Sequence, residues 1–160
     1  PFLFHDTVYY NVAYGVEKTS LEVVEEACKA AQIHDVIVAL PNGYETLVGE
    51  RGHRLSGGEI QRLAIARVLL KDPRILIFDE ATSAVDSIAE AQIQRAVQSL
   101  TKDRTTIAIA HRLSTILAAD VILVLDNGKI VESGIHSELI NDGGLYAQIY
   151  EEQFSPEGIH

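Results

Sequence analysis

The sequence is poor in cysteine: Cys28 stands alone among 160 residues. One thiol excludes a disulfide framework within the chain and a cysteine-rich metal site. A lone cysteine is most often a small, buried, apolar residue, so we expect Cys28 to lie in the core.

Long hydrophobic runs are missing as well. No apolar segment approaches the roughly 20 residues that cross a membrane. The first residues also lack the charged segment and hydrophobic stretch of a secretory signal. We therefore expect the polypeptide as given to be soluble, with no signal peptide and no transmembrane span.

Basic residues are scarce, since 13 lysines and arginines stand against 23 aspartates and glutamates, for a net charge of −10. This balance disfavours non-specific attraction to nucleic acid or to an anionic membrane, so we expect no nucleic-acid partner. By contrast, 47% of the residues are hydrophobic and 22% are charged. At this length, such a composition suits one globular domain with a substantial core.

The first third of the chain is predicted to be mostly helical. The spacing of Thr19 and Glu22 matches a capping box, and Val24, Ala27 and Ala31 would share the apolar face of the helix that follows.

A second helix is expected at residues 35–40, before a Pro-Asn-Gly break. A loop rich in glycine then leads to a third helix that starts near Gly57 and stops at Lys71, Asp72 and Pro73.

A strand, a helix and a second strand follow. Residues 75–78 form an apolar run without polar alternation, which predicts a strand buried on both faces. Ser87 and Glu90 match a second capping box, and residues 105–110 form another strand. The helix between the two strands would bury one face, formed by Ala89, Ile93, Ala96, Val97 and Leu100. Parallel strands with a right-handed crossover would place their carboxyl ends on one edge of a sheet.

The last part of the chain predicts a hairpin and two helices. Asn127 and Gly128 favour a type I′ turn between strands at residues 121–125 and 130–132. Gly143 and Gly144 would end a short helix. The final helix is expected to pack three residues inward: Tyr146, Ile149 and Tyr150.

Residues 55–62 read L-S-G-G-E-I-Q-R and indicate a phosphate site. Ser56 can cap a helix whose first residues are Gly57 and Gly58, so bare backbone N–H groups and the positive end of the helix dipole meet any ligand. Such a site favours an anion, above all phosphate.

Polar residues follow both predicted strands. Asp79 would end the first strand and can hold Mg²⁺, while Glu80 can orient and deprotonate an attacking water. His111 follows the second strand and can hydrogen-bond a γ-phosphate and that water. Ligands of open α/β sheets bind at the carboxyl ends of strands, so these three residues are predicted to form one site.

Together these motifs resemble the C-terminal part of the nucleotide-binding domain of an ATP-binding cassette (ABC) transporter of the exporter type. Residues 55–62 match the family signature L-S-G-G-Q-x-Q-R except at Glu59, where the family usually has glutamine. Residues 75–80 match the Walker B strand, and residues 83–86 are similar to the D-loop. His111 matches the switch histidine.

Two further segments resemble exporters. Residues 48–52 resemble the loop that contacts the coupling helices of the transmembrane domains, and residues 2–15 resemble the stretch after the Q-loop. The opening residues and residues 55–59 are similar to half-transporters of the mitochondrial and heavy-metal group.

The resemblance implies an α/β fold, with part of the parallel sheet of a P-loop NTPase (RecA-like) and an α-helical subdomain inserted before the Walker B strand. Residues 1–72 would form the helical subdomain, and residues 73–160 the C-terminal half of the ATPase core. ATP and Mg²⁺ are the implied cofactors. The implied partners are a second nucleotide-binding domain and transmembrane domains that dock near Glu50, which would place the domain on the cytosolic or matrix side of a membrane.

The resemblance also implies a role for each motif residue. Asp79 would hold magnesium, Glu80 would be the catalytic base and His111 the switch. These three would serve the ATP of their own subunit. Three residues of the signature would serve the ATP of the partner: Ser56, Gly57 and Gly58. The resemblance also implies that Glu59 of the signature and Asp86 of the D-loop are nucleotide-binding residues.

One family motif is not found in the sequence. The pattern G-x-x-x-x-G-K-[ST] does not occur, because the only Gly-Lys pair, Gly128 and Lys129, has Leu123 where the first glycine should be. We therefore expect the chain to be a fragment that neither binds ATP tightly nor hydrolyses it alone.

The sequence leaves two alternatives open. L-S-G-G-E is also common in soluble ABC ATPases of DNA repair and chromosome maintenance, although the loop at residues 48–52 and the net charge argue for a transporter. The chain could instead be a non-catalytic folding or interaction module.

Overall fold

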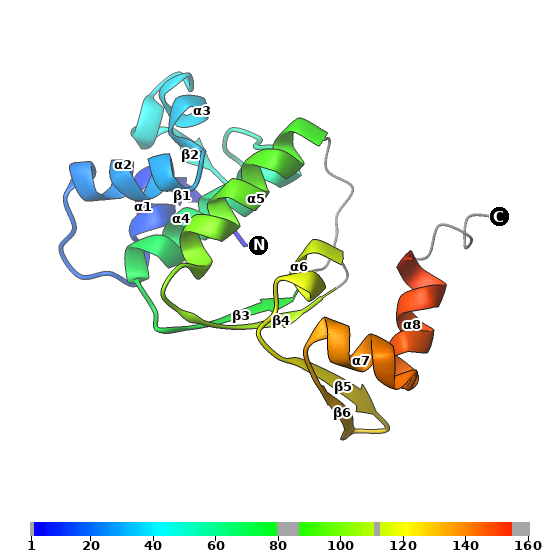
Figure 1. Ribbon diagram of the computed structural model, residues 1–160. Helices are drawn as coiled ribbons and strands as arrows, with labels where there is room; N and C mark the ends of the chain where they lie inside the picture. The colour runs from blue at the N-terminus through cyan, green and yellow to red at the C-terminus, as the bar shows by residue number, and fades with distance from the viewer. Residues whose placement is uncertain (1, 80–86, 111–112, 155–160) are drawn as a thin grey trace. The chain divides into compact units, whose positions relative to one another are not determined.

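The computed structural model describes residues 2–79, 87–110 and 113–154, without the side chains of residues 87–90 (Figure 1). The chain divides into two compact units. The first comprises Pro1–Ile77 and Thr82–Ile107, and the second comprises Phe78–Ala81 and Ala108–His160.

The first unit is mainly helical. Its long helix α4 packs against α1, α2 and α5. The two-residue strands β1 and β2 pair in antiparallel fashion beside these helices. The elements of this unit are β1 (Asp6–Thr7), α1 (Val8–Ala13), α2 (Leu21–Ala30), α3 (His34–Val38), the 3₁₀ helix η1 (Gly43–Glu45), β2 (Leu47–Val48), α4 (Gly57–Lys71) and α5 (Ser87–Thr101).

Helix α2 begins one residue later than a capping box at Thr19 would require. Its N-cap is Ser20, whose side chain makes no capping hydrogen bond. A box pairs the cap with the third helical residue, and that position holds Val23, so the predicted box with Glu22 is wrong. The predicted apolar face is confirmed, because its three residues are buried: Val24, Ala27 and Ala31.

The core of the first unit contains Cys28, which is fully buried as predicted. Residues of all the surrounding helices complete this core, including Val8, Val12, Ile33, Ile37, Leu63, Ile93, Ala96 and Leu100. The expected apolar face of α5 is therefore confirmed at Ile93, Ala96 and Leu100, while its predicted capping box at Ser87 and Glu90 lies outside the described side chains.

Strands β3 (Ile75–Asp79) and β4 (Thr105–Ile109) are hydrogen-bonded neighbours, which confirms that they pair, while their parallel direction stays a prediction. The prediction that the first strand is buried on both faces is wrong. Leu76 is 5% exposed, whereas Ile75 is 63% and Ile77 75% exposed. Alternate side chains of a strand point to opposite faces, and the described part of the chain covers only the face of Leu76.

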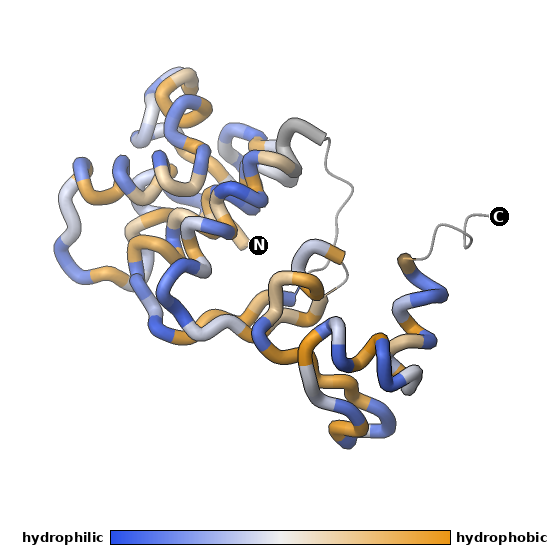
Figure 2. Tube along the Cα trace, viewed as in Figure 1, coloured by the Kyte–Doolittle hydropathy of each residue, from blue (hydrophilic) through white to orange (hydrophobic). Residues whose placement is uncertain are grey.

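The second unit contains α6 (Leu113–Leu117), β5 (Ile122–Asp126), β6 (Lys129–Gly134), α7 (His136–Asp142) and α8 (Leu145–Phe154). Strands β5 and β6 form the predicted antiparallel hairpin. Asn127 and Gly128 have φ values of 46° and 76°, as a type I′ turn requires. Figure 2 shows hydrophobic residues along these strands and hydrophilic ones at their turn.

Helices α7 and α8 pack on the hairpin through a core of Val124, Leu139 and Tyr146. Gly143 ends α7 in the left-handed conformation, which confirms that stop signal. The inward direction predicted for Tyr146 is confirmed, and Tyr150 packs against this core, whereas Ile149, also predicted to face inward, is 37% exposed.

The start of α8 is held by one carboxylate. Glu132 Oε1 accepts a hydrogen bond from the backbone N–H of Leu145 at 2.5 Å, and Glu132 Oε2 accepts one from Tyr146 at 3.0 Å. A negative charge is favourable at this end of a helix, so Glu132 fixes α8 to strand β6.

Candidate functional site

The first component of the site is the amino end of α4. Ser56 is its N-cap, with extended backbone angles of φ −67° and ψ 162°. Ser56 Oγ accepts from the backbone N–H of Glu59 at 3.3 Å, and Glu59 Oε2 accepts from the backbone N–H of Ser56 at 2.7 Å. The predicted helix start at Gly57 is confirmed. The capping box itself was not predicted, although its S-x-x-E spacing is visible in the sequence.

The hydrogen bonds of the capping box do not involve the backbone N–H groups of the two glycines at the start of the helix. The first N–H groups of an α-helix have no partner within the helix, and here the box engages those of Ser56 and Glu59. Ser56 and Gly57 are exposed, and Gly58 is buried. A Cβ built on Gly57 would meet no atom within 4 Å, so the space beside its amide is open. A phosphate group fits this arrangement of exposed amide, hydroxyl and helix dipole.

Helix α4 is anchored at two points along its length. Arg62 is 3% exposed, and its Nη1 donates to Gln92 Oε1 of α5 at 2.6 Å. Arg67 donates through Nε to Asn11 O at 2.7 Å, through Nη1 to Phe2 O at 3.2 Å and through Nη2 to Asn11 Oδ1 at 3.3 Å. The helix that begins at the signature therefore also holds the first residues of the chain.

Asn11 organises this amino-terminal segment. Its side chain is fully buried, accepts from the backbone N–H of Phe4 at 2.8 Å, and donates to the carbonyls of Phe4 and Thr7 at 3.0 Å each. The Arg67 guanidinium lies 5.7 Å from the centre of the Phe4 ring. The surrounding aromatic side chains form a contiguous cluster of Phe2, Phe4, Tyr10 and Tyr14.

The loop before the signature touches the same segment. Gly49 has a φ of +94°, and a Cβ there would lie 2.8 Å from the carbonyl oxygen of Phe4. A hollow of about 160 Å³ lies between this loop and the start of α4. It is lined by Leu3, Gly49, His53, Arg54, Leu55 and Ile60. The exporter-like loop and the signature therefore lie next to each other.

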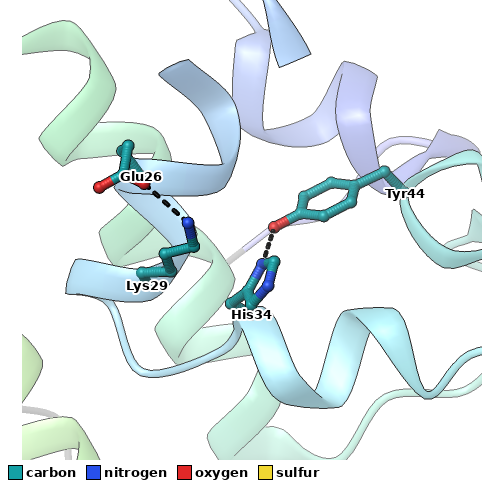
Figure 3. A network of polar contacts seen from close by, with 4 residues as sticks. All are labelled: Glu26, Lys29, His34 and Tyr44. Carbon is teal, nitrogen blue, oxygen red and sulfur yellow. Dashed lines mark hydrogen bonds and ion pairs between the residues drawn. The ribbon is translucent and has the colours of Figure 1, made fainter. Parts of the chain in front are cut away.

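A polar network lies in the helical part of the first unit (Figure 3). His34 Nδ1 and the Tyr44 hydroxyl are 2.9 Å apart, and Lys29 pairs with Glu26 at 2.7 Å. Burial raises the pKa of the Cys28 thiol to about 11 and also raises the pKa of Tyr44. Both groups are therefore neutral near pH 7, which suits packing rather than nucleophilic chemistry.

The second predicted component, at the ends of β3 and β4, is described only in part. Asp79 is the last residue of β3 and is exposed. Glu80, Asp86 and His111 lie outside the described residues. Within the described ranges, no group of three or more acidic, histidine or cysteine side chains lies close enough to hold a metal ion. Asp79 nonetheless fits Mg²⁺, which is typically bound by one or two carboxylates together with substrate phosphates.

Comparison with known proteins identifies the family. The ABC transporter family profile matches residues 4–83. An ATP-dependent lipid A-core flippase of Saccharophagus degradans is 56% identical over 153 residues, which cover 96% of this chain and 26% of the flippase. Heavy metal tolerance factor 1 of Caenorhabditis elegans is 52% identical over 155 residues, covering 97% of this chain and 19% of that protein.

A solved structure agrees with these relatives. A bacterial Atm1-family ABC exporter with ATP bound superposes with a TM-score of 0.81 at 53% identity, over 95% of this chain and 27% of the exporter chain. The chain thus spans between about a fifth and about a quarter of the length of these relatives. In the residues that the structure describes, no helix is long and apolar enough to cross a membrane. The α/β fold is that of an ABC ATPase domain, and the chain belongs to the ABC transporter family.

Proposed function

We propose that this chain is part of the ATP-hydrolysing cassette of an ABC exporter, in which two cassettes bind two ATP molecules head to tail. The observation that carries this proposal is the open amino end of α4, where exposed Ser56 and Gly57 can meet a phosphate. The similarity to an exporter with ATP bound supports the same function. The names of the relatives and the net charge of −10 favour an exporter over an ATPase that acts on DNA.

The signature and the strand ends would serve different nucleotides. Ser56, Gly57 and Gly58 would bind the ATP of the partner cassette, and Glu59 and Asp86 would lie beside a bound nucleotide. In the chain's own subunit, Asp79 would hold Mg²⁺, Glu80 would accept a proton from the attacking water, and His111 would contact the γ-phosphate. Magnesium, when bound, would offset charge on the phosphates.

The two parts of the chain would have separate roles. Residues 1–72 would form the helical subdomain, and residues 73–160 would belong to the ATPase core. Transmembrane domains would dock near Glu50. The close approach of Gly49 to Phe4 supports this docking site, because it joins the loop to the exposed aromatic residues at the amino end.

A substitution at Gly57 tests the proposal in the intact transporter. Gly57→Asp places a carboxylate beside the open amide, where it should repel phosphate and prevent ATP-dependent closure of the two cassettes. The folded chain should tolerate this change, since no atom lies within 4 Å of the new Cβ. Gly58 is buried, so a side chain there would disturb packing as well.

Closure can be measured by ATP-dependent cross-linking between the cassettes. Glu80→Gln provides the complementary measurement, because loss of a positioned general base should lower hydrolysis by about 10² to 10⁴ while ATP binding is retained. Normal closure with Gly57→Asp would show that the amino end of α4 is not a nucleotide site.

A further inference from the structure

Glu59 is the one position of the signature at which this chain departs from the family pattern, and it lies at the end of the helix where phosphate would bind. We propose that the Glu59 carboxylate weakens the hold of the signature on the partner's ATP, so that Glu59 sets the nucleotide concentration needed for closure. This inference rests on the proposed function and concerns the regulation of the same site.

The capping box fixes the position of the charge. Glu59 Oε2 accepts from the backbone N–H of Ser56 at 2.7 Å, and this bond keeps the carboxylate at the amino end of α4. Glu59 is half-buried, so water screens its charge less than that of a fully exposed side chain. Neither of the two ion pairs found among the described residues involves Glu59.

Two effects of this carboxylate act in the same direction. It neutralises part of the positive end of the helix dipole in the free protein, which lowers the gain when a phosphate arrives. It also repels the negative triphosphate directly, since like charges at short range disfavour each other. The exposed side chains of His53 and Arg54 lie just before the signature, and neither forms an ion pair with Glu59.

Glutamine separates charge from shape. A glutamine side chain has the same length and can still accept from the N–H of Ser56, so Glu59→Gln keeps the capping box and removes the charge. The helix start should therefore be preserved, and the affinity change should report the carboxylate itself.

The test uses the intact transporter in a Glu80→Gln background, where slow hydrolysis allows closure to be titrated with Mg-ATP. Adding Glu59→Gln should lower the half-saturating ATP concentration for inter-cassette cross-linking by roughly fivefold to thirtyfold, in the range of typical coupling between sites. Raising the salt concentration should reduce this difference, because salt screens the repulsion. Glu45→Gln is the matched control, since it removes one exposed carboxylate of the same unit away from α4 and should leave closure unchanged.

The outcomes separate this inference from the proposed function. If Gly57→Asp blocks closure but Glu59→Gln titrates like the parent, or shifts no more than Glu45→Gln, the inference about Glu59 is overturned and the nucleotide site remains. If Gly57→Asp closes normally, the proposed function itself fails. A change in half-saturation that does not depend on salt would also overturn the electrostatic inference.

Discussion

Arg67 should stabilise the amino-terminal segment more than any exposed charge of the chain. Its guanidinium makes three hydrogen bonds to Phe2 and Asn11 and lies over the ring of Phe4. Arg67→Leu would remove all of these contacts and leave oxygens of the buried Asn11 without these donors. Hydrogen bonds to charged groups contribute about 1.5–3 kcal/mol each, but contacts that share one side chain are not additive. We expect a loss of about 2–4 kcal/mol in the stability of this segment.

Hydrogen exchange in the intact protein can measure this loss locally. The backbone N–H of Phe4 donates to Asn11 Oδ1, so its exchange reports release of the segment. A loss of this size should accelerate exchange by roughly 30- to 1,000-fold, since each 1.36 kcal/mol is a factor of ten.

Two control variants test whether the guanidinium fork is responsible. Arg67→Lys keeps the charge but loses the planar set of donors, so it should give an intermediate acceleration. Arg95→Leu changes an exposed arginine of α5 and should alter exchange little. Acceleration by less than about threefold with Arg67→Leu would refute the reasoning, because the three hydrogen bonds would then contribute almost nothing.

Three further predictions concern backbone strain, ionisation and the isolated chain. Gly49→Ala should destabilise the first unit by more than about 1 kcal/mol, because the φ of Gly49 is +94° and the new Cβ would lie 2.8 Å from Phe4 O. Gly57→Ala is the control and should be tolerated, so equal thermal stabilities of the two variants would contradict this prediction. Burial raises the pKa of Cys28 from 9.0 to about 11, so above pH 9 the unfolded chain binds fewer protons than the folded one. The free energy of unfolding should therefore fall between pH 9 and 11. A Cys28→Ala variant that keeps the same pH dependence there would exclude the thiol as the cause. The 160-residue polypeptide alone should show no saturable heat in calorimetry with Mg-ATP up to low millimolar concentration, and micromolar binding that is lost with Asp79→Ala would be the contrary result. It should also self-associate in sedimentation through the exposed faces of β3 and β4, and a monodisperse monomer would contradict this.

Local signals in the sequence determined the start of α4, the hairpin turn and the end of α7. Each depends on neighbouring residues: Ser56 before two glycines, Asn127 with Gly128, and Gly143 after a short helix. The ordered motifs also led to the family, because their spacing along the chain is itself the signal. These features follow from backbone sterics and short-range hydrogen bonds, which act regardless of the rest of the fold.

Only the tertiary structure decided which residues meet across the chain and which faces are covered. Arg67 and Asn11 are far apart in sequence, and no local pattern indicates that their side chains bond. The apolar run of β3 predicted burial on both faces, but Ile75 and Ile77 are exposed, because burial depends on what packs against a strand and not on its own composition. The same reason applies to Ile149 of α8, which the sequence predicted to face inward and which is 37% exposed.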